Sequence, residues 1–307
     1  MTIHELHPEP GFTTDVFDRS AAPVLTVDPG DTVVARSLDA AGFLERQRTP
    51  GEERPRMFDG RRGHCLTGPI AVRGAEPGDV LAVHIVSADP GEWGWTTAGA
   101  KDNALNRALG LTGAPTWLLW EIDADAGTAT DDRGHTVRIS PFLGVIGMPP
   151  DERGRHSTIT PRAAGGGNID CRDLTAGATL FLPVTVPGAL VHLGDGHAAQ
   201  GDGEVSQTAI ETSLRGRVQL TVRKGMTLSW PRAETATDYI SMGTDEDLKV
   251  ATTIAIQEMV DFLASTKGLS KHEAYQLVSI AGHVAVTQLV DRPVYGVHVR
   301  MPKATFK

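Results

Sequence analysis

Short runs of β-branched and aliphatic residues recur through the first 240 positions, separated by segments rich in glycine, proline and aspartate. Such runs are typical of strands joined by tight turns. The segments Asp28–Asp31 and Glu76–Asp79 each carry Pro-Gly at their centre and precede such a run. Proline fixes its own φ, and glycine accepts a positive φ, as tight turns require. The pattern therefore predicts strands at residues 32–35, 70–72, 80–86, 180–184 and 218–222.

After residue 244 the apolar positions recur at helical spacing instead. Residues 244–247 resemble a capping box, and the helix that follows them would end near residue 267. Ser270 and Glu273 have the spacing of another capping box, which predicts a second helix that ends at Gly282.

Strands therefore dominate the chain, and two strand-like runs, 284–290 and 294–299, close it. This order of elements predicts an α+β fold that is mostly β, with a β-sandwich-like bulk and two helices near the C-terminus. A weak similarity between positions 70–81 and 169–180 suggests two related β units. We expect residues 1–307 to form a single unit, which would consist of two intimate β-rich subdomains, about 1–160 and 161–307, if that similarity reflects a repeat.

Composition and charge narrow the classes of partner. Of the 307 residues, 40% are hydrophobic and 22% are charged, and the net charge of -9 comes without any cluster of cations, which argues against nucleic acid. The N-terminal residues contain no basic leader, and the most apolar run, 180–193, is interrupted by prolines and is too short to span a bilayer. We therefore expect a cytoplasmic protein with no membrane partner, in which Cys65 and Cys171 are buried free thiols.

The segment Gly194–Glu204 concentrates acidic and amide side chains, one histidine and four glycines within eleven residues. In an extended chain Asp195 and His197 would project to the same face, because side chains alternate along a strand. Asp202 and Glu204 would do the same. An exposed loop with aspartate and glycine as turn formers has a similar composition, but it does not need a central histidine. Histidine and carboxylates on a pliable backbone are typical of a metal site.

Further polar residues lie upstream of this segment. Asn168 and Asp170 follow three glycines, although a strand entry in which both bind local backbone amides would have the same sequence. His64 precedes a predicted strand and His192 lies in an apolar run, and on spacing alone both are more typical of structural histidines. Four tryptophans are expected in the core or at an interface because indole rings bury a large apolar area: Trp93, Trp95, Trp117 and Trp120.

The sequence GDGHAAQGDGEV at 194–205, together with GGNID at 166–170, resembles the acetamidase/formamidase family. Shorter similarities cover most of the chain and lie at residues 66–69, 74–79, 144–147, 174–177, 186–189 and 287–291. The resemblance implies a β-rich, oligomeric, metal-containing enzyme that hydrolyses formamide, acetamide and related short amides to the acid and ammonia. It supports these site positions: His64, Asn168, Asp170, Asp195, His197, Gln200, Asp202 and Glu204.

Amide chemistry suggests roles for these residues. A catalyst must supply a nucleophile, polarise the carbonyl and protonate the departing nitrogen. We expect Asp195, His197 and Asp170 to hold a divalent metal that activates a water molecule. Glu204 would act as base and then acid, and Asp202 would orient His197 or share the metal. The expected substrate contacts are Asn168, Gln200 and His64.

Mixed nitrogen and oxygen ligands favour zinc or another transition metal, and the many carboxylates could add a calcium site. The expected partners are a small amide and further copies of the chain in a homo-oligomer.

Two other classes of protein fit part of the sequence pattern. One is a non-catalytic β-sandwich module that binds metal or carbohydrate, and the other is a metal-dependent oxygenase, which would need a second histidine from His64, His192 or His283. Ammonia release from a small amide would separate the hydrolase from both.

Overall fold

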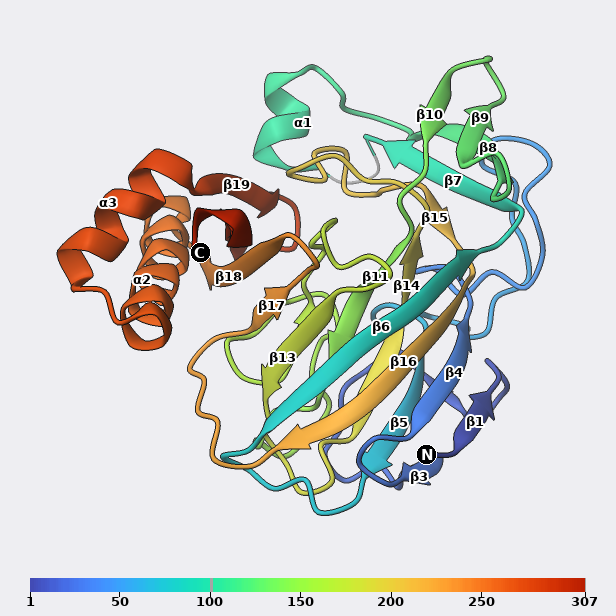
Figure 1. Cartoon of the computed structure of the whole chain (residues 1–307). Helices are drawn as coiled ribbons and strands as arrows, with labels where there is room; N and C mark the ends of the chain where they lie inside the picture. Colours follow the sequence, from blue (N-terminus) through green and yellow to red (C-terminus); the bar gives the residue numbers. More distant parts are fainter. Residues whose placement is uncertain (100–101, 307) are drawn as a thin grey trace.

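A computed structural model describes residues 1–99 and 102–306 (Figure 1). One of its two sheets contains nine strands, and neighbouring strands are antiparallel except for the first pair. Their order across the sheet is β1 (Ile3–Leu6), β4 (Thr32–Ser37), β16 (Leu214–Arg223), β6 (Val80–Pro90), β13 (Thr179–Pro183), β17 (Arg232–Glu234), β18 (Asp238–Asp245), β20 (Tyr295–Pro302) and β19 (His283–Gln288).

The other sheet contains eleven strands and carries most of the candidate site residues. Its main path runs through β10 (Thr136–Arg138), β9 (Thr128–Asp131), β8 (Thr116–Asp123), β7 (Trp93–Ala98), β15 (Glu211–Thr212), β14 (Val191–His197), β11 (Phe142–Gly147) and β12 (Gly166–Asn168). In addition, β5 (Leu66–Val72) pairs with β14, and β2 (Thr13–Thr14) and β3 (Leu25–Val27) pair with β5.

The largest apolar cluster lies between the two sheets. It joins Val83 on β6 and Val218 on β16 to Ile146 on β11 and Leu193 on β14, all fully buried. Aliphatic side chains that alternate along each strand thus meet in one core, which is the packing of a β-sandwich. The predicted α+β, mostly β class is therefore confirmed. Both sheets draw strands from both halves of the chain, so a boundary near residue 160 does not separate one sheet from the other.

Two helices lie together at one end of the molecule, beside β18, β19 and β20 (Figure 1). Helix α2 (Leu248–Lys267) begins after the N-cap Asp247 and ends at Gly268, whose φ of 68° suits glycine. Helix α3 (Lys271–Ala281) begins with the predicted capping box of Ser270. Helix α2 packs closely on β18 because Gly243 has no side chain: a Cβ there would lie 2.6 Å from the carbonyl oxygen of Ala251.

The predicted strands all overlap observed ones: β4, β5, β6, β13 and β16, and β19 and β20 at the end of the chain. The sequence pattern missed the short helix α1 (Ala104–Ala108), which is capped by Asn103, and the 3-10 turn at Lys303–Thr305. Within residues 1–99 and 102–306, no helix has the length and apolar character needed to cross a membrane.

Candidate active site

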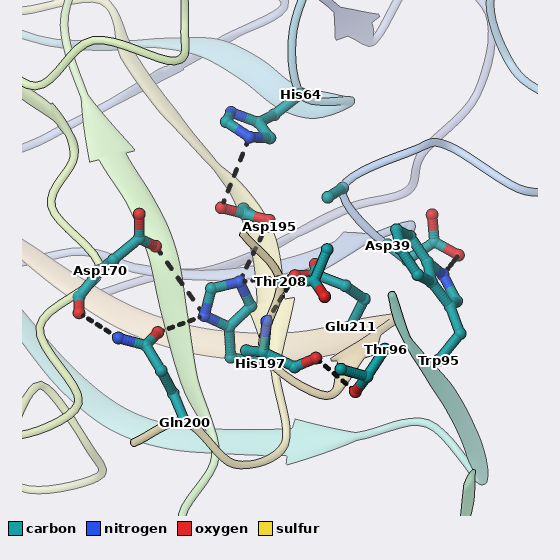
Figure 2. A network of polar contacts seen from close by, with 12 residues as sticks. Asp39, His64, Trp95, Thr96, Asp170, Asp195, His197, Gln200, Thr208 and Glu211 are labelled. Carbon is teal, nitrogen blue, oxygen red and sulfur yellow. Dashed lines mark hydrogen bonds and ion pairs between the residues drawn. The ribbon is translucent and has the colours of Figure 1, made fainter. Parts of the chain in front are cut away.

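The C-terminal end of β14 carries Asp195 and His197, and strands on both sides bring further polar residues to it. His197 is the register partner of Phe142 on β11 and of Glu211 on β15. Asp170 follows β12, which pairs with the other end of β11. Figure 2 shows the carboxylates of Asp170, Asp195 and Glu211 around the imidazole of His197. Segments far apart in the sequence thus build one polar cluster inside a largely apolar sheet.

Five carboxylates and one histidine form this cluster. Each is at most 7% exposed: Asp170, Asp195, His197, Glu204, Glu211 and Asp291. Three overlapping groups have potential ligand atoms within 4.8 Å of one another: Asp170, Asp195 and His197; His197, Glu204 and Glu211; and Asp170, Glu204 and Asp291. Buried carboxylates need a proton or a cation, because an ionised group loses its solvation there. The cluster therefore has the composition and spacing of a cation site.

Three of the acidic residues hold their carboxylates in place with unusual backbone conformations. Asp170, Asp195 and Glu204 have φ values of 49°, 58° and 44°, in the left-handed region that residues other than glycine rarely adopt. Gly144 on β11 lies between two of these carboxylates. A Cβ there would be 2.5 Å from Asp170 Oδ1 and 2.6 Å from Asp195 Oδ2. A glycine is therefore required for the two acids to approach the strand this closely.

Gln200 determines which nitrogen of His197 faces the acids. The Gln200 side-chain amide donates to the carbonyl oxygen of Asp170 at 2.7 Å, so its Oε1 faces His197 and accepts from Nδ1 at 2.9 Å. When the imidazole loses its extra proton, the hydrogen that Gln200 accepts stays on Nδ1 and Nε2 is left as an acceptor. Nε2 lies 3.4 Å from Asp195 Oδ1 and 3.4 Å from Glu211 Oε1, but it makes no well-aligned hydrogen bond. A free imidazole nitrogen directed at carboxylates is a typical metal ligand.

Electrostatics of the carboxylates follow from their burial. Burial raises the pKa of Asp170 and of Glu204 well above the ordinary value, and neighbouring carboxylates raise it further. Burial also raises the pKa of Glu211, to about 7. Without a cation, burial therefore favours the protonated forms of these side chains.

Asp195 and His197 form the charged pair of the cluster. Burial alone would raise the pKa of Asp195, but His64 and His197 bring it well below its usual value. Burial alone would lower the pKa of His197, but Glu211 and Asp195 raise it well above its usual value. A divalent cation would take the place of the imidazolium proton and of the protons on the acids, because metal ligands bind in their deprotonated forms.

The cluster opens into a cavity of about 330 Å³. Its lining includes His64, Asn168, Asp170, Asp195, Glu204, Glu211 and Asp291. His64 Nε2 lies 3.9 Å from Asp195 Oδ2, and burial lowers the pKa of His64 although the Asp195 carboxylate opposes this shift. Asn168 directs an oxygen without a hydrogen-bond partner into this buried region. The cavity thus combines potential cation ligands, a buried carboxyl group and an amide acceptor.

Of the eight sequence-predicted site residues, five line this cavity: His64, Asn168, Asp170, Asp195 and Glu204. A sixth, His197, belongs to the carboxylate cluster. Asp202 does not line this cavity. It is exposed, because the chain turns at Gly203, whose φ is 92°, and the extended geometry expected for 202–204 is wrong. Gln200 orients His197, the role expected of Asp202. It lines a different cavity, and both ends of its amide are engaged, so it is not placed to hold a substrate.

Sequence reasoning missed Glu211 and Asp291. Glu211 lies in a two-residue strand with no surrounding pattern of polar residues, so nothing local distinguishes it. Asp291 ends the 287–291 similarity and could have been selected from it. Cys65 and Cys171 are buried free thiols, as expected, and burial raises the pKa of Cys65 to about 12.

Comparison with known proteins identifies the relatives of this chain. The model of the Acetamidase/Formamidase family matches residues 13–154 and 152–307. A putative formamidase of Schizosaccharomyces pombe is 30% identical over 232 residues, which make up 59% of this chain and 56% of that protein. A formamidase of Methylophilus methylotrophus is 27% identical over 237 residues, 60% of this chain and 57% of that protein. The matched region thus spans just over half the length of these curated relatives.

Solved structures match over nearly the whole chain. The acetamidase from Bacillus halodurans has a TM-score of 0.87 and 30% identity, with 98% of both chains covered. The acetamidase from Yersinia enterocolitica has a TM-score of 0.86 and 29% identity, with 99% of this chain and 92% of that chain covered. The fold and the family motifs therefore agree.

Proposed function

The chain belongs to the acetamidase/formamidase family, and from that premise we propose that it hydrolyses short aliphatic amides, such as formamide and acetamide, to the carboxylic acid and ammonia. The buried group of Asp170, Asp195 and His197 carries this proposal. It lies beside Glu204, a carboxyl group with a raised pKa, in one cavity. The relatives named formamidase and acetamidase support the same chemistry.

We propose that Asp195, His197 and Asp170 hold a divalent cation, with Glu211 as a further donor. The free Nε2 of His197 and the Asp195 oxygen beside it fit such an ion. When bound, the cation would polarise the amide carbonyl and lower the pKa of a water molecule. The imidazole favours zinc or another transition metal. Asp170, Glu204 and Asp291 offer only oxygen atoms, which is the donor set that calcium prefers.

We propose that Glu204 moves the proton. In the reaction a water oxygen forms a bond to the carbonyl carbon and the C–N bond breaks. Glu204 would accept a proton from the attacking water and return it to the departing nitrogen, so that ammonia leaves and the acid remains. Burial and the neighbouring carboxylates raise the pKa of Glu204 and so favour its protonated form, which is the form that gives a proton to the departing nitrogen.

Asn168 and His64 would orient the substrate. The free Asn168 oxygen can accept from the substrate NH2 group, and this holds the amide plane in a fixed direction. His64 lines the cavity, and its Nε2 lies 3.9 Å from Asp195 Oδ2. A hydrogen bond from His64 to Asp195 would keep that carboxylate directed at the site. A hydrogen bond from His64 to the substrate would instead help to orient the amide.

We also propose a cytoplasmic homo-oligomer, and its assembly rests on the family resemblance. Light scattering on the purified protein measures the number of chains per particle. A monomer at micromolar concentration would contradict the assembly without affecting the proposed chemistry.

Ammonia release from formamide, acetamide and propionamide tests the function. We expect release that is lost on chelation and restored by zinc or another divalent metal. His197→Ala should lose metal and activity together, whereas Glu204→Gln should keep the metal and lose about 10²- to 10⁴-fold in kcat. His135→Ala, at an exposed histidine that pairs with Asp131, is the matched control. Metal binding without ammonia from any amide would instead support a non-catalytic metal-binding module.

A further inference from the structure

The cavity that holds the carboxylate cluster also has an aromatic wall, formed by Phe43, Trp95 and Trp117. The ring centroids of Trp95 and Trp117 are 5.3 Å apart, and those of Phe43 and Trp95 are 6.0 Å apart. Trp95 and Phe43 are also members of a small apolar cluster of their own. The sequence predicts Trp95 and Trp117 in the core or at an interface, and the structure shows that they line the same space as the candidate catalytic groups.

The aromatic wall lies next to the proposed reacting centre. Trp95 on β7 is the direct register partner of Glu211 on β15, so the two side chains are cross-strand neighbours. Glu211 in turn lies 3.4 Å from His197 Nε2. Figure 2 shows Glu211 between the imidazole of His197 and the indole of Trp95 in this view. A substrate whose amide reaches the cluster would therefore extend its acyl group along the indoles.

Buried polar contacts hold the aromatic wall in place before any ligand binds. The Trp95 indole nitrogen donates to Asp39 Oδ2 at 3.2 Å, and Asp39 is itself 1% exposed. The guanidinium groups of Arg54 and Arg56 lie over the Phe43 ring, 3.5 Å and 4.5 Å from its centroid. A fixed apolar surface of this kind binds a flat group with little loss of side-chain freedom.

The size of the cavity exceeds what the shortest amides need. Its volume of about 330 Å³ is within the range of sites that enclose drug-sized ligands, whereas acetamide has only four non-hydrogen atoms. Three arginines also line it: Arg61 donates to the Ala40 carbonyl, Arg62 pairs with Asp15, and the Arg56 guanidinium lies over the Phe43 ring. The aromatic wall therefore offers an apolar surface to an acyl group, in a space larger than acetamide fills.

We propose that the preferred substrates are primary amides whose acyl group ends in a flat apolar ring, which stacks against Trp95 and Trp117. This inference rests on the proposed amide hydrolysis and names the substrate class for the same site. The amide would lie at the Asp195–His197 cluster, and the ring would take the space that acetamide leaves unfilled. Aromatic stacking adds to the burial of apolar area, so the ring should raise kcat/KM well above that of short aliphatic amides.

The test compares acetamide, propionamide, cyclohexylacetamide and phenylacetamide by ammonia release from the metal-loaded protein. We expect kcat/KM for phenylacetamide to exceed that for acetamide at least tenfold, with cyclohexylacetamide between them. Trp117→Ala and Trp117→Leu should both reduce the phenylacetamide-to-acetamide ratio about tenfold, a change of the size that one lost apolar contact produces. Trp230→Ala removes a half-buried indole that lines a different cavity, and it should leave the ratio unchanged.

Inhibition of acetamide hydrolysis provides a readout of binding alone. Phenylacetate should inhibit at least tenfold more strongly than acetate, and Trp117→Leu should remove most of the difference. An acetamide kcat/KM equal to or above that of phenylacetamide would overturn this inference and leave amide hydrolysis intact. A Trp117 variant that folds normally and slows both substrates equally would also overturn it. If no amide releases ammonia, the proposed function fails as well.

Discussion

Replacing Gly144 by alanine tests whether the cluster depends on the close approach of two carboxylates to β11. The new Cβ would lie 2.5 Å from Asp170 Oδ1 and 2.6 Å from Asp195 Oδ2, whereas ordinary contact begins at 3.4 Å. To reach 3.4 Å, the Asp170 oxygen would have to move by 0.9 Å from 2.5 Å and the Asp195 oxygen by 0.8 Å from 2.6 Å. The φ of Gly144 is outside the left-handed region, so alanine fits the backbone and the effect is steric.

A displacement of about 1 Å at a catalytic site can cost roughly 100-fold in rate, and overpacking a buried site costs about 1–3 kcal/mol of stability. We therefore expect Gly144→Ala to fold with a lower Tm, to bind zinc at least tenfold more weakly, and to lose about 100-fold in kcat/KM for acetamide. Metal analysis, thermal unfolding and ammonia release measure these three quantities.

The control for this substitution is Gly201→Ala, because no heavy atom lies within 4 Å of a Cβ at that position. It should match the wild type in all three measurements. If Gly144→Ala kept its metal and retained kcat/KM within twofold, the positions of Asp170 and Asp195 beside β11 would not matter for the reaction, and the proposed ligand set would be refuted.

Three further outcomes follow from the cluster. The metal-free protein should lose stability as pH rises from about 4.5 to 7. The pKa of Glu211 is about 7 in the folded state and 4.5 ordinarily, so folding favours the protonated form. Urea unfolding from pH 4.5 to 8 measures this, and a free energy of unfolding that increases with pH would contradict it. Gln200→Leu leaves His197 Nδ1 without its acceptor and should weaken zinc binding about 10- to 100-fold; an unchanged Kd would show that Gln200 does not orient the ligand. Asp202→Asn, at an exposed position, should keep kcat/KM within twofold of the wild type, and a tenfold loss would return Asp202 to the catalytic set.

The fold class is predictable here because its signals are local. The capping box at Ser270 and the glycine at 268 mark real helix boundaries. The pairing of strands is not predictable in this way, because it depends on contacts between segments that are distant in the sequence. β14 pairs with β5, β11 and β15, which come from three separate parts of the chain, and no turn motif joins it to any of them. Periodicity identifies the strands but does not determine the order in which they pair.

The same distinction explains the site. Asp195 and His197 are predictable because they occur together in a segment dense in polar residues. Glu211 is a lone acid in its segment and becomes a neighbour of His197 only through the pairing of β15 with β14. The prediction for Asp202 is wrong for a local reason. Side chains alternate only where the backbone is extended, and the chain turns at Gly203.

Three features of the cluster oppose the stability of the folded chain, and they fall on the same residues. Asp170, Asp195 and Glu204 take left-handed backbone conformations, each of which costs about 1–3 kcal/mol. Their carboxylates are buried close to one another, which raises the pKa of two of them. Asp170 and Asp195 also crowd Gly144. Apolar residues would fill this volume without backbone strain or buried charge, so the arrangement does not contribute to the stability of the core. A cation that binds only the folded chain offsets these costs by stabilising that state. Backbone strain and buried acidic groups that coincide on the same residues are typical of a functional site.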